Sequence, residues 1–152
     1  MKLAEALALR AEMRTKMNNI QSRLNNNAKV QDGETPAENP YSLIEELNSV
    51  SDEMENLIKN INYTNCMTLE NGVSLTDMIA EKDVLKEKIT VMKNFLSNAG
   101  AVVNRYSNKE IKIYSTVDVA ELQKKVDAMS KHLRELDMNI QRINWTVDLI
   151  EK

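Results

Sequence analysis

The chain offers few side chains that could carry out catalysis. Its 152 residues contain one histidine, His132, and one cysteine, Cys66. A lone histidine cannot build a metal site with two or three imidazole ligands, and no nucleophile is spaced to reach it. Cys66 stands just past a predicted helix, whose dipole disfavours a thiolate there. The sequence therefore predicts that the protein is not an enzyme and holds no metal or other cofactor.

Two related polar motifs are the most unusual feature. Each follows the pattern I-x-x-I-N-[Tyr/Trp]-T near the end of a predicted helix, although Asn and Thr are poor helix formers. One interpretation is structural: the amides bond to backbone groups and fix the register of a helical bundle. The other is a polar binding pocket made of both motifs. The residues concerned are Asn62, Tyr63, Thr64, Asn144, Trp145 and Thr146.

Cations and aromatic rings meet in the segment 101–117. Arg105, Lys109 and Lys112 could bind a phosphorylated ligand or nucleic acid, with Tyr106 and Tyr114 as stacking rings. The alternative is a solvated charged face, which is the usual role of such charges. The net charge of −3 supplies no global field toward nucleic acid or an anionic membrane. Both partners are therefore unlikely on charge alone.

The elements that position these residues are long helices. Apolar residues repeat at alternating steps of three and four, and only three Gly and two Pro interrupt them. Helices are predicted at about 2–26, from Pro40 to about 61, from about 75 to 97, and from 119 onward. Asn39 followed by Pro40, and Asp118 with Glu121, have the residue types of helix N-termini.

The fold class predicted from this pattern is mainly α. We expect an antiparallel four-helix bundle of two coiled-coil-like helical hairpins, forming a single helical domain over residues 1–152. The long connections should add a small β element. Strands are predicted at 102–106 and 111–115, with 28–31 as a third, and Asn71-Gly72 has the composition of a tight turn or small hairpin.

The last predicted helix carries the longest apolar seam, which stays apolar to its end. It is longer than its neighbours, and an apolar stripe left uncovered usually marks an interface. We therefore expect a homo-oligomer, with even symmetry favoured, and a structural or interaction role through self-assembly or another protein partner. The interface residues predicted are Leu133, Leu136, Ile140, Ile143, Val147 and Ile150.

Composition also bears on the compartment. A single cysteine fits a reducing environment, and the start of the chain has no continuous apolar stretch of the kind found in export signals. No run approaches the ~20 apolar residues that cross a bilayer. The sequence thus predicts a cytoplasmic protein.

Several longer segments resemble a known family. They are MKLAEAL, NAKVQDGETPAENP, INYTN, LTDMIAEKD, RYSNKEIKIYSTVDVAELQKK and INWTVDL. Together they are similar to septicolysin-like proteins, a family of small uncharacterised bacterial helical proteins. The resemblance implies a helical cytosolic protein of bacteria without an assigned activity. The family's name implies a cytolysin acting on membranes, which gives an alternative function.

Overall fold

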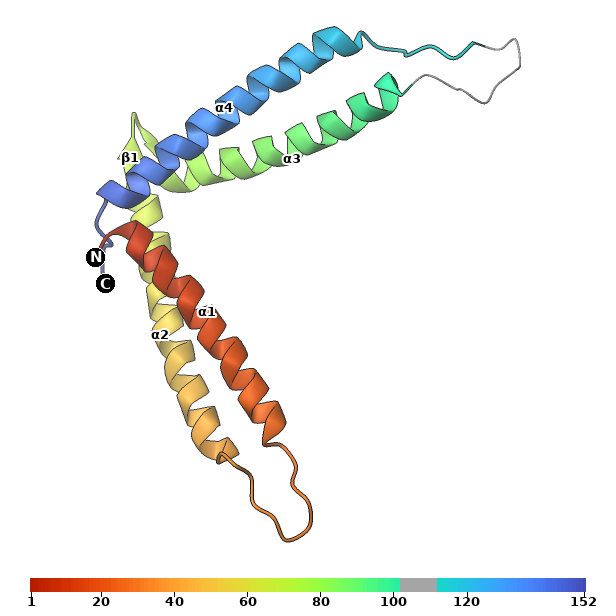
Figure 1. The fold of residues 1–152 in the computed structure, drawn as a ribbon. Coiled ribbons are helices and arrows are strands. Elements are labelled where there is room, and N and C mark those ends of the chain that lie inside the picture. The colour runs from red at the N-terminus through yellow and green to blue at the C-terminus, as the bar shows by residue number, and fades with distance from the viewer. Residues whose placement is uncertain (102–111) are drawn as a thin grey trace. The chain divides into compact units, whose positions relative to one another are not determined.

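The computed structural model of the chain describes residues 1–101 and 112–152. In these residues the protein is mainly helical, with one small antiparallel sheet, which confirms the predicted fold class (Figure 1). In chain order the elements are α1 (Leu3–Asn26), α2 (Pro40–Met67), β1 (Leu69–Glu70), β2 (Val73–Ser74), α3 (Leu75–Gly100) and α4 (Val119–Thr146).

The chain separates into two compact units. The first comprises Met1–Ser74 and Arg142–Lys152, and the second comprises Leu75–Gln141. Each unit is described by itself below. The expectation of a single domain over residues 1–152 stays a prediction.

The first unit is built on the antiparallel pair α1 and α2 (Figure 1). The helix α2 begins as predicted, because the side chain of Asn39 accepts a hydrogen bond from the backbone N–H of Tyr41 at 2.9 Å and Pro40 takes the first helical position. The two helices bury a narrow seam of apolar side chains. Its members in the two helices are Leu3, Ala6, Ile20, Leu43, Val50, Leu57 and Ile61.

The connection 27–39 between α1 and α2 is closed by polar contacts. Asn27 is buried, and its side chain donates to the carbonyl of Arg23 at 2.8 Å and accepts from the backbone N–H of Glu38 at 2.9 Å. Gly33 turns the chain with φ of +81°. The strand predicted at 28–31 is absent: these residues are exposed, and no strand lies beside them in the described part of the connection.

The sheet is a single hairpin between α2 and α3. Asn71 and Gly72 form its turn with φ of 53° and 82°, and Leu69 pairs with Ser74. This is the hairpin that the Asn-Gly pair predicted, because both residues tolerate positive φ. Residues 112–115 form no strand. The remaining strand predictions, 102–106 and position 111, lie outside the described residues.

The C-terminal segment completes the first unit by binding to its other parts. The backbone of Leu3 donates to Val147 at 3.0 Å and that of Leu149 donates to Met1 at 2.9 Å, while Lys2 forms an ion pair with Asp148 at 2.8 Å. The hydrogen bond from Lys2 lowers the pKa of Asp148. These contacts tie both ends of the chain to one region.

The second unit contains α3 and the part of α4 up to Gln141. Ile89 and Leu96 of α3 pack with Val126 of α4 in a buried cluster, and half-buried apolar residues surround it. Two polar pairs join the helices: His132 with Glu81 at 2.9 Å, and Lys82 with Asp137 at 3.2 Å. As predicted, Asp118 caps α4, because its side chain accepts from the N–H of Glu121 at 3.0 Å.

Candidate functional site

The apolar face of α2 is wider than the seam that α1 covers. Beside the buried residues runs a second apolar row with spacings of three, seven and four, which keep it on one side of the helix. The row consists of Ile44, Leu47, Met54 and Ile58. Ile44 is 43% exposed, and the other three are half-buried. A width of three apolar positions per heptad is typical of bundle helices, whereas a two-helix seam needs only two.

The helix α1 shows the same incomplete cover. Leu3 and Ile20 are fully buried, but Met17 and Leu24 are half-buried although they belong to the same helical pattern. Met17 and Leu24 lie seven residues apart and therefore share a face. They meet Leu47 of α2 across a groove.

This groove, here called the amide groove, has a volume of about 320 Å³. Its floor is apolar and its rim carries uncharged amides, which can donate and accept hydrogen bonds. The lining residues are Met17, Asn18, Gln21, Leu24, Asn25 and Leu47. The amide groove and the second apolar row lie on the same flank of the hairpin, because Leu47 belongs to both.

Charges of opposite sign border this flank. Arg10 and Arg14 share a face with Met17 and Gln21 of the amide groove, whereas Glu55 shares a face with Ile58 of the second apolar row. Within the described part of the chain, Arg10, Arg14 and Asp52 form no ion pair. Glu55 bonds to Lys59 at 2.5 Å, and this hydrogen bond lowers the pKa of Glu55.

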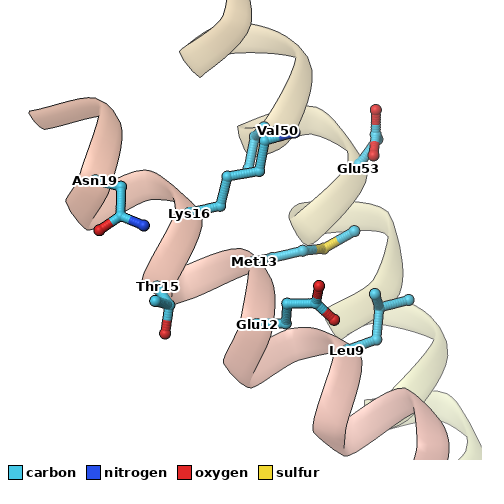
Figure 2. A pocket seen from close by; sticks show the side chains of 8 residues that line it. All are labelled: Leu9, Glu12, Met13, Thr15, Lys16, Asn19, Val50 and Glu53. Atoms are coloured by element: carbon cyan, nitrogen blue, oxygen red, sulfur yellow. The ribbon is translucent and has the colours of Figure 1, made fainter. Parts of the chain in front are cut away.

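A second groove, here called the charged groove, follows the opposite flank of the same hairpin. Its volume is about 390 Å³, and Figure 2 shows Met13 and Lys16 extending from α1 toward α2 while Thr15 and Asn19 point away. The apolar members are Leu9, Met13 and Val50, and the charged members are Glu12, Lys16 and Glu53. Of these residues Val50 is buried, Leu9 and Met13 are half-buried, and the three charged side chains are exposed.

The residues predicted as an interface on the last helix are mostly covered by the chain itself. Leu136, Ile140 and Ile143 are 8%, 2% and 3% exposed, so a second chain could reach them only if this chain opened. Leu133 packs against the buried cluster of the second unit, and Val147 is half-buried. Of the six, only Ile150, at 39%, is exposed. This stripe is therefore mostly covered in the single chain, and an interface at these residues stays a prediction.

The two polar motifs occupy different environments. Thr64 is fully buried and Asn144 is 7% exposed, whereas Asn62, Trp145 and Thr146 are exposed. The Thr64 hydroxyl donates to the carbonyl of Asn60 at 2.8 Å and accepts from the N–H of Ile150 at 2.9 Å. Its role is to hold the C-terminal segment, which supports the structural interpretation for this residue.

The aromatic members of the motifs also differ. The ring of Tyr63 lies under the ammonium of Lys152, with 3.6 Å between the nitrogen and the ring centroid, so it too holds the C-terminal segment. Trp145 is 63% exposed. A pocket shared by both motifs stays a prediction.

The remaining predicted site residues are spread over the chain. Lys112 is exposed, while Arg105 and Lys109 lie outside the described residues, so an anion site there stays a prediction. His132 pairs with Glu81 on an exposed surface, and the Cys66 side chain is exposed. Among the described side chains, no group of three or more His, Cys, Asp and Glu residues is arranged to hold a metal ion.

The fold defines a class of protein: a mainly helical chain of helical hairpins with a minimal β-hairpin. Within this class, residues 10–149 match a family model described as "Family of unknown function (DUF6847)", and the chain belongs to this family. A solved structure described as a functionally unknown conserved protein from Corynebacterium diphtheriae is 38% identical, with 99% of each chain covered and a TM-score of 0.90. No curated protein matches the chain.

These comparisons correct the family resemblance drawn from the sequence. The matching family is the one of unknown function, so the assignment to septicolysin-like proteins is wrong, and the cytolysin that it implied loses its basis. In the described residues, none of the helices combines the length and the apolar character needed to cross a membrane.

Sequence reasoning missed the second apolar row, although its signal was present. Leu47 and Met54 alternate with the buried residues of α2 at steps of three and four, and Ile44 and Ile58 lie one position from buried ones. Counting three apolar positions per heptad instead of two would have shown that this helix needs more than one neighbour.

Proposed function

We propose that this protein is a self-assembling helical module in which the α1–α2 hairpins of two copies pack together. The surface used is here called the assembly face. It comprises the amide groove and the second apolar row. The role is structural or interactional and needs no catalytic group, and we place it in the cytoplasm.

The observation that supports this proposal is the half-buried state of residues that follow a core pattern. Leu47, Met54 and Ile58 have the spacing of buried residues, yet α1 covers them only in part. Burying apolar surface contributes roughly 25 cal/mol per Å², so covering such a row stabilises whatever covers it. A second hairpin would convert two thin seams into one four-helix core.

A second copy of this chain suits the assembly face better than an unrelated helix because of charge. The helix α1 has four cations and two anions, while α2 has five anions and one cation. Each hairpin therefore offers one basic and one acidic helix, and two copies can complement each other without any other partner.

Solution mass tests the proposal directly. Light scattering over a range of protein concentrations should give twice the mass of one chain. The variant Leu47→Lys, which puts a charge into the amide groove, should shift the protein to one chain. The matched control is Leu9→Lys, because Leu9 is also half-buried but lies in the charged groove. This control should keep the dimer.

Circular dichroism of both variants must show the helical content of the parent, so that a change of mass is not a loss of fold. A parent protein that has the mass of one chain at all concentrations would overturn the proposal. So would a dimer that Leu47→Lys leaves intact.

A further inference from the structure

The assembly proposed above can be built in two symmetric ways, and the charges of the hairpin distinguish them. A two-fold axis parallel to the helices places α1 of each copy over α2 of the other. An axis perpendicular to the helices within the interface places α1 over α1 and α2 over α2. Both bury the assembly face, since a two-fold interface uses the same patch on both copies.

We infer that the axis runs parallel to the helices. With four cations against two anions, α1 is net positive, and with five anions against one cation, α2 is net negative. The parallel axis pairs opposite charges on both sides of the interface, whereas the perpendicular axis pairs like charges on both sides. Like charges across an interface suppress a mode of association even where the apolar contacts would permit it.

The antiparallel register of α1 and α2 within one hairpin determines which charged residues of the two copies lie opposite each other. Arg23 of α1 bonds to Glu46 of α2 at 3.1 Å, and Lys16 shares the charged groove with Val50. Continuing this antiparallel register along the helices places Arg14 level with residues 52 to 55 of α2. Rotation about a parallel axis does not shift a helix along its length, so Arg14 of one copy is also level with residues 52 to 55 of the other copy.

Arg14 of one copy therefore faces Glu55 of the other copy, because Glu55 shares a face with Ile58 of the assembly face. Both side chains are exposed in the single chain, where Glu55 also pairs with Lys59 of its own helix. The proposed arrangement thus gives a partner to Arg14, whose charge forms no ion pair in the described residues of the single chain.

The parallel axis has a consequence away from the interface. It brings the two 27–39 connections to the same end of the assembly, where they form one composite polar surface. The perpendicular axis would place them at opposite ends, separated by at least the length of α1. That length is about 36 Å for 24 residues at 1.5 Å each.

Charge reversal is the first test, and it rests on the proposed function. Arg14→Glu should raise the dimer dissociation constant at least tenfold, and adding Glu55→Arg in the same chain should restore most of the loss. Lys16→Glu is the matched control, because it makes the same change two residues away in the charged groove and should alter the constant less than twofold. Tighter association of Arg14→Glu would overturn the inference, since it would mean that like charges face each other.

A distance measurement is the second test. A spin label is attached at Asp32→Cys in the exposed connection of a chain that also carries Cys66→Ser, and dipolar spectroscopy reports the distance between copies. Neighbouring helices are 8–10 Å apart, so the parallel axis should give a distance below about 30 Å. A distance beyond about 40 Å would overturn the arrangement but leave self-assembly intact. The absence of any dipolar signal would overturn both proposals.

Discussion

Replacing Thr64 by Val should release the C-terminal segment while leaving the shape of the side chain almost unchanged. Thr64 is fully buried, and its hydroxyl is the acceptor for the backbone N–H of Ile150. A net hydrogen bond contributes about 1 kcal/mol, and a buried donor left without an acceptor costs up to about 3 kcal/mol. This hydrogen bond is only partly buried, so water can replace the hydroxyl in part. We therefore expect a loss of about 1–2 kcal/mol.

Hydrogen exchange of the Ile150 amide measures this loss at the site. A change of 1–2 kcal/mol corresponds to a 5- to 30-fold increase in the opening of the segment. The control is Thr64→Ser, which keeps the hydroxyl and loses one buried methyl, at a cost of about 1 kcal/mol in the free energy of unfolding. It should lower the urea midpoint and leave Ile150 protected. Unchanged protection of Ile150 in Thr64→Val would refute the role assigned to this hydroxyl.

Three further changes test other parts of the fold. The hydrogen bond from Arg23 lowers the pKa of Glu38 below its usual 4.5. This pair therefore stabilises the folded state above that pH, and the stabilisation is lost as the pH falls through the lower pKa that Glu38 has in the folded state. Glu38→Gln should therefore have a lower melting temperature than the parent at pH 7, and the gap should shrink between about pH 5 and pH 3; a constant gap would contradict the assignment. Val126→Ala, at a fully buried position between α3 and α4, should cost about 2 kcal/mol in urea unfolding, whereas Val84→Ala, at a residue that is 66% exposed, should stay within about 0.5 kcal/mol. Equal effects would mean that the buried cluster does not hold the second unit together. Gly72→Ala should cost about 1–2 kcal/mol by thermal unfolding, because the left-handed backbone and not a steric clash opposes a Cβ there.

Local features were predictable because they depend on neighbouring residues. Asn39 with Pro40 and Asp118 with Glu121 start helices as expected, since a side-chain oxygen reaches a backbone N–H only two or three residues away. The Asn71-Gly72 turn forms because its two φ values are intrinsic to those residue types. The absent strand at 28–31 shows the limit: a short segment forms a strand only where another strand is present to pair with it.

Long-range contacts of the site were not predictable in the same way. Thr64 binds the backbone of a residue 86 positions away, and Asn27 joins the two ends of the 27–39 connection. Nothing in the identity of a threonine or an asparagine specifies such a partner. The polar motif around Thr64 could be recognised as unusual, but its task of holding the C-terminal segment follows only from the fold.

The interface prediction illustrates how apolar periodicity and exposure differ. The seam of α4 is the clearest apolar pattern in the chain. A regular apolar period shows that one face of a helix is covered, but it does not identify the element that covers it. Leu136 and Ile140 are already covered in the single chain, and an interface at these residues stays a prediction. The less regular hairpin α1–α2 has apolar positions beyond what one neighbouring helix can bury. An interface is therefore better sought where the width of an apolar face exceeds its cover, and by that criterion Leu47 and Met54 take precedence over the long seam of α4.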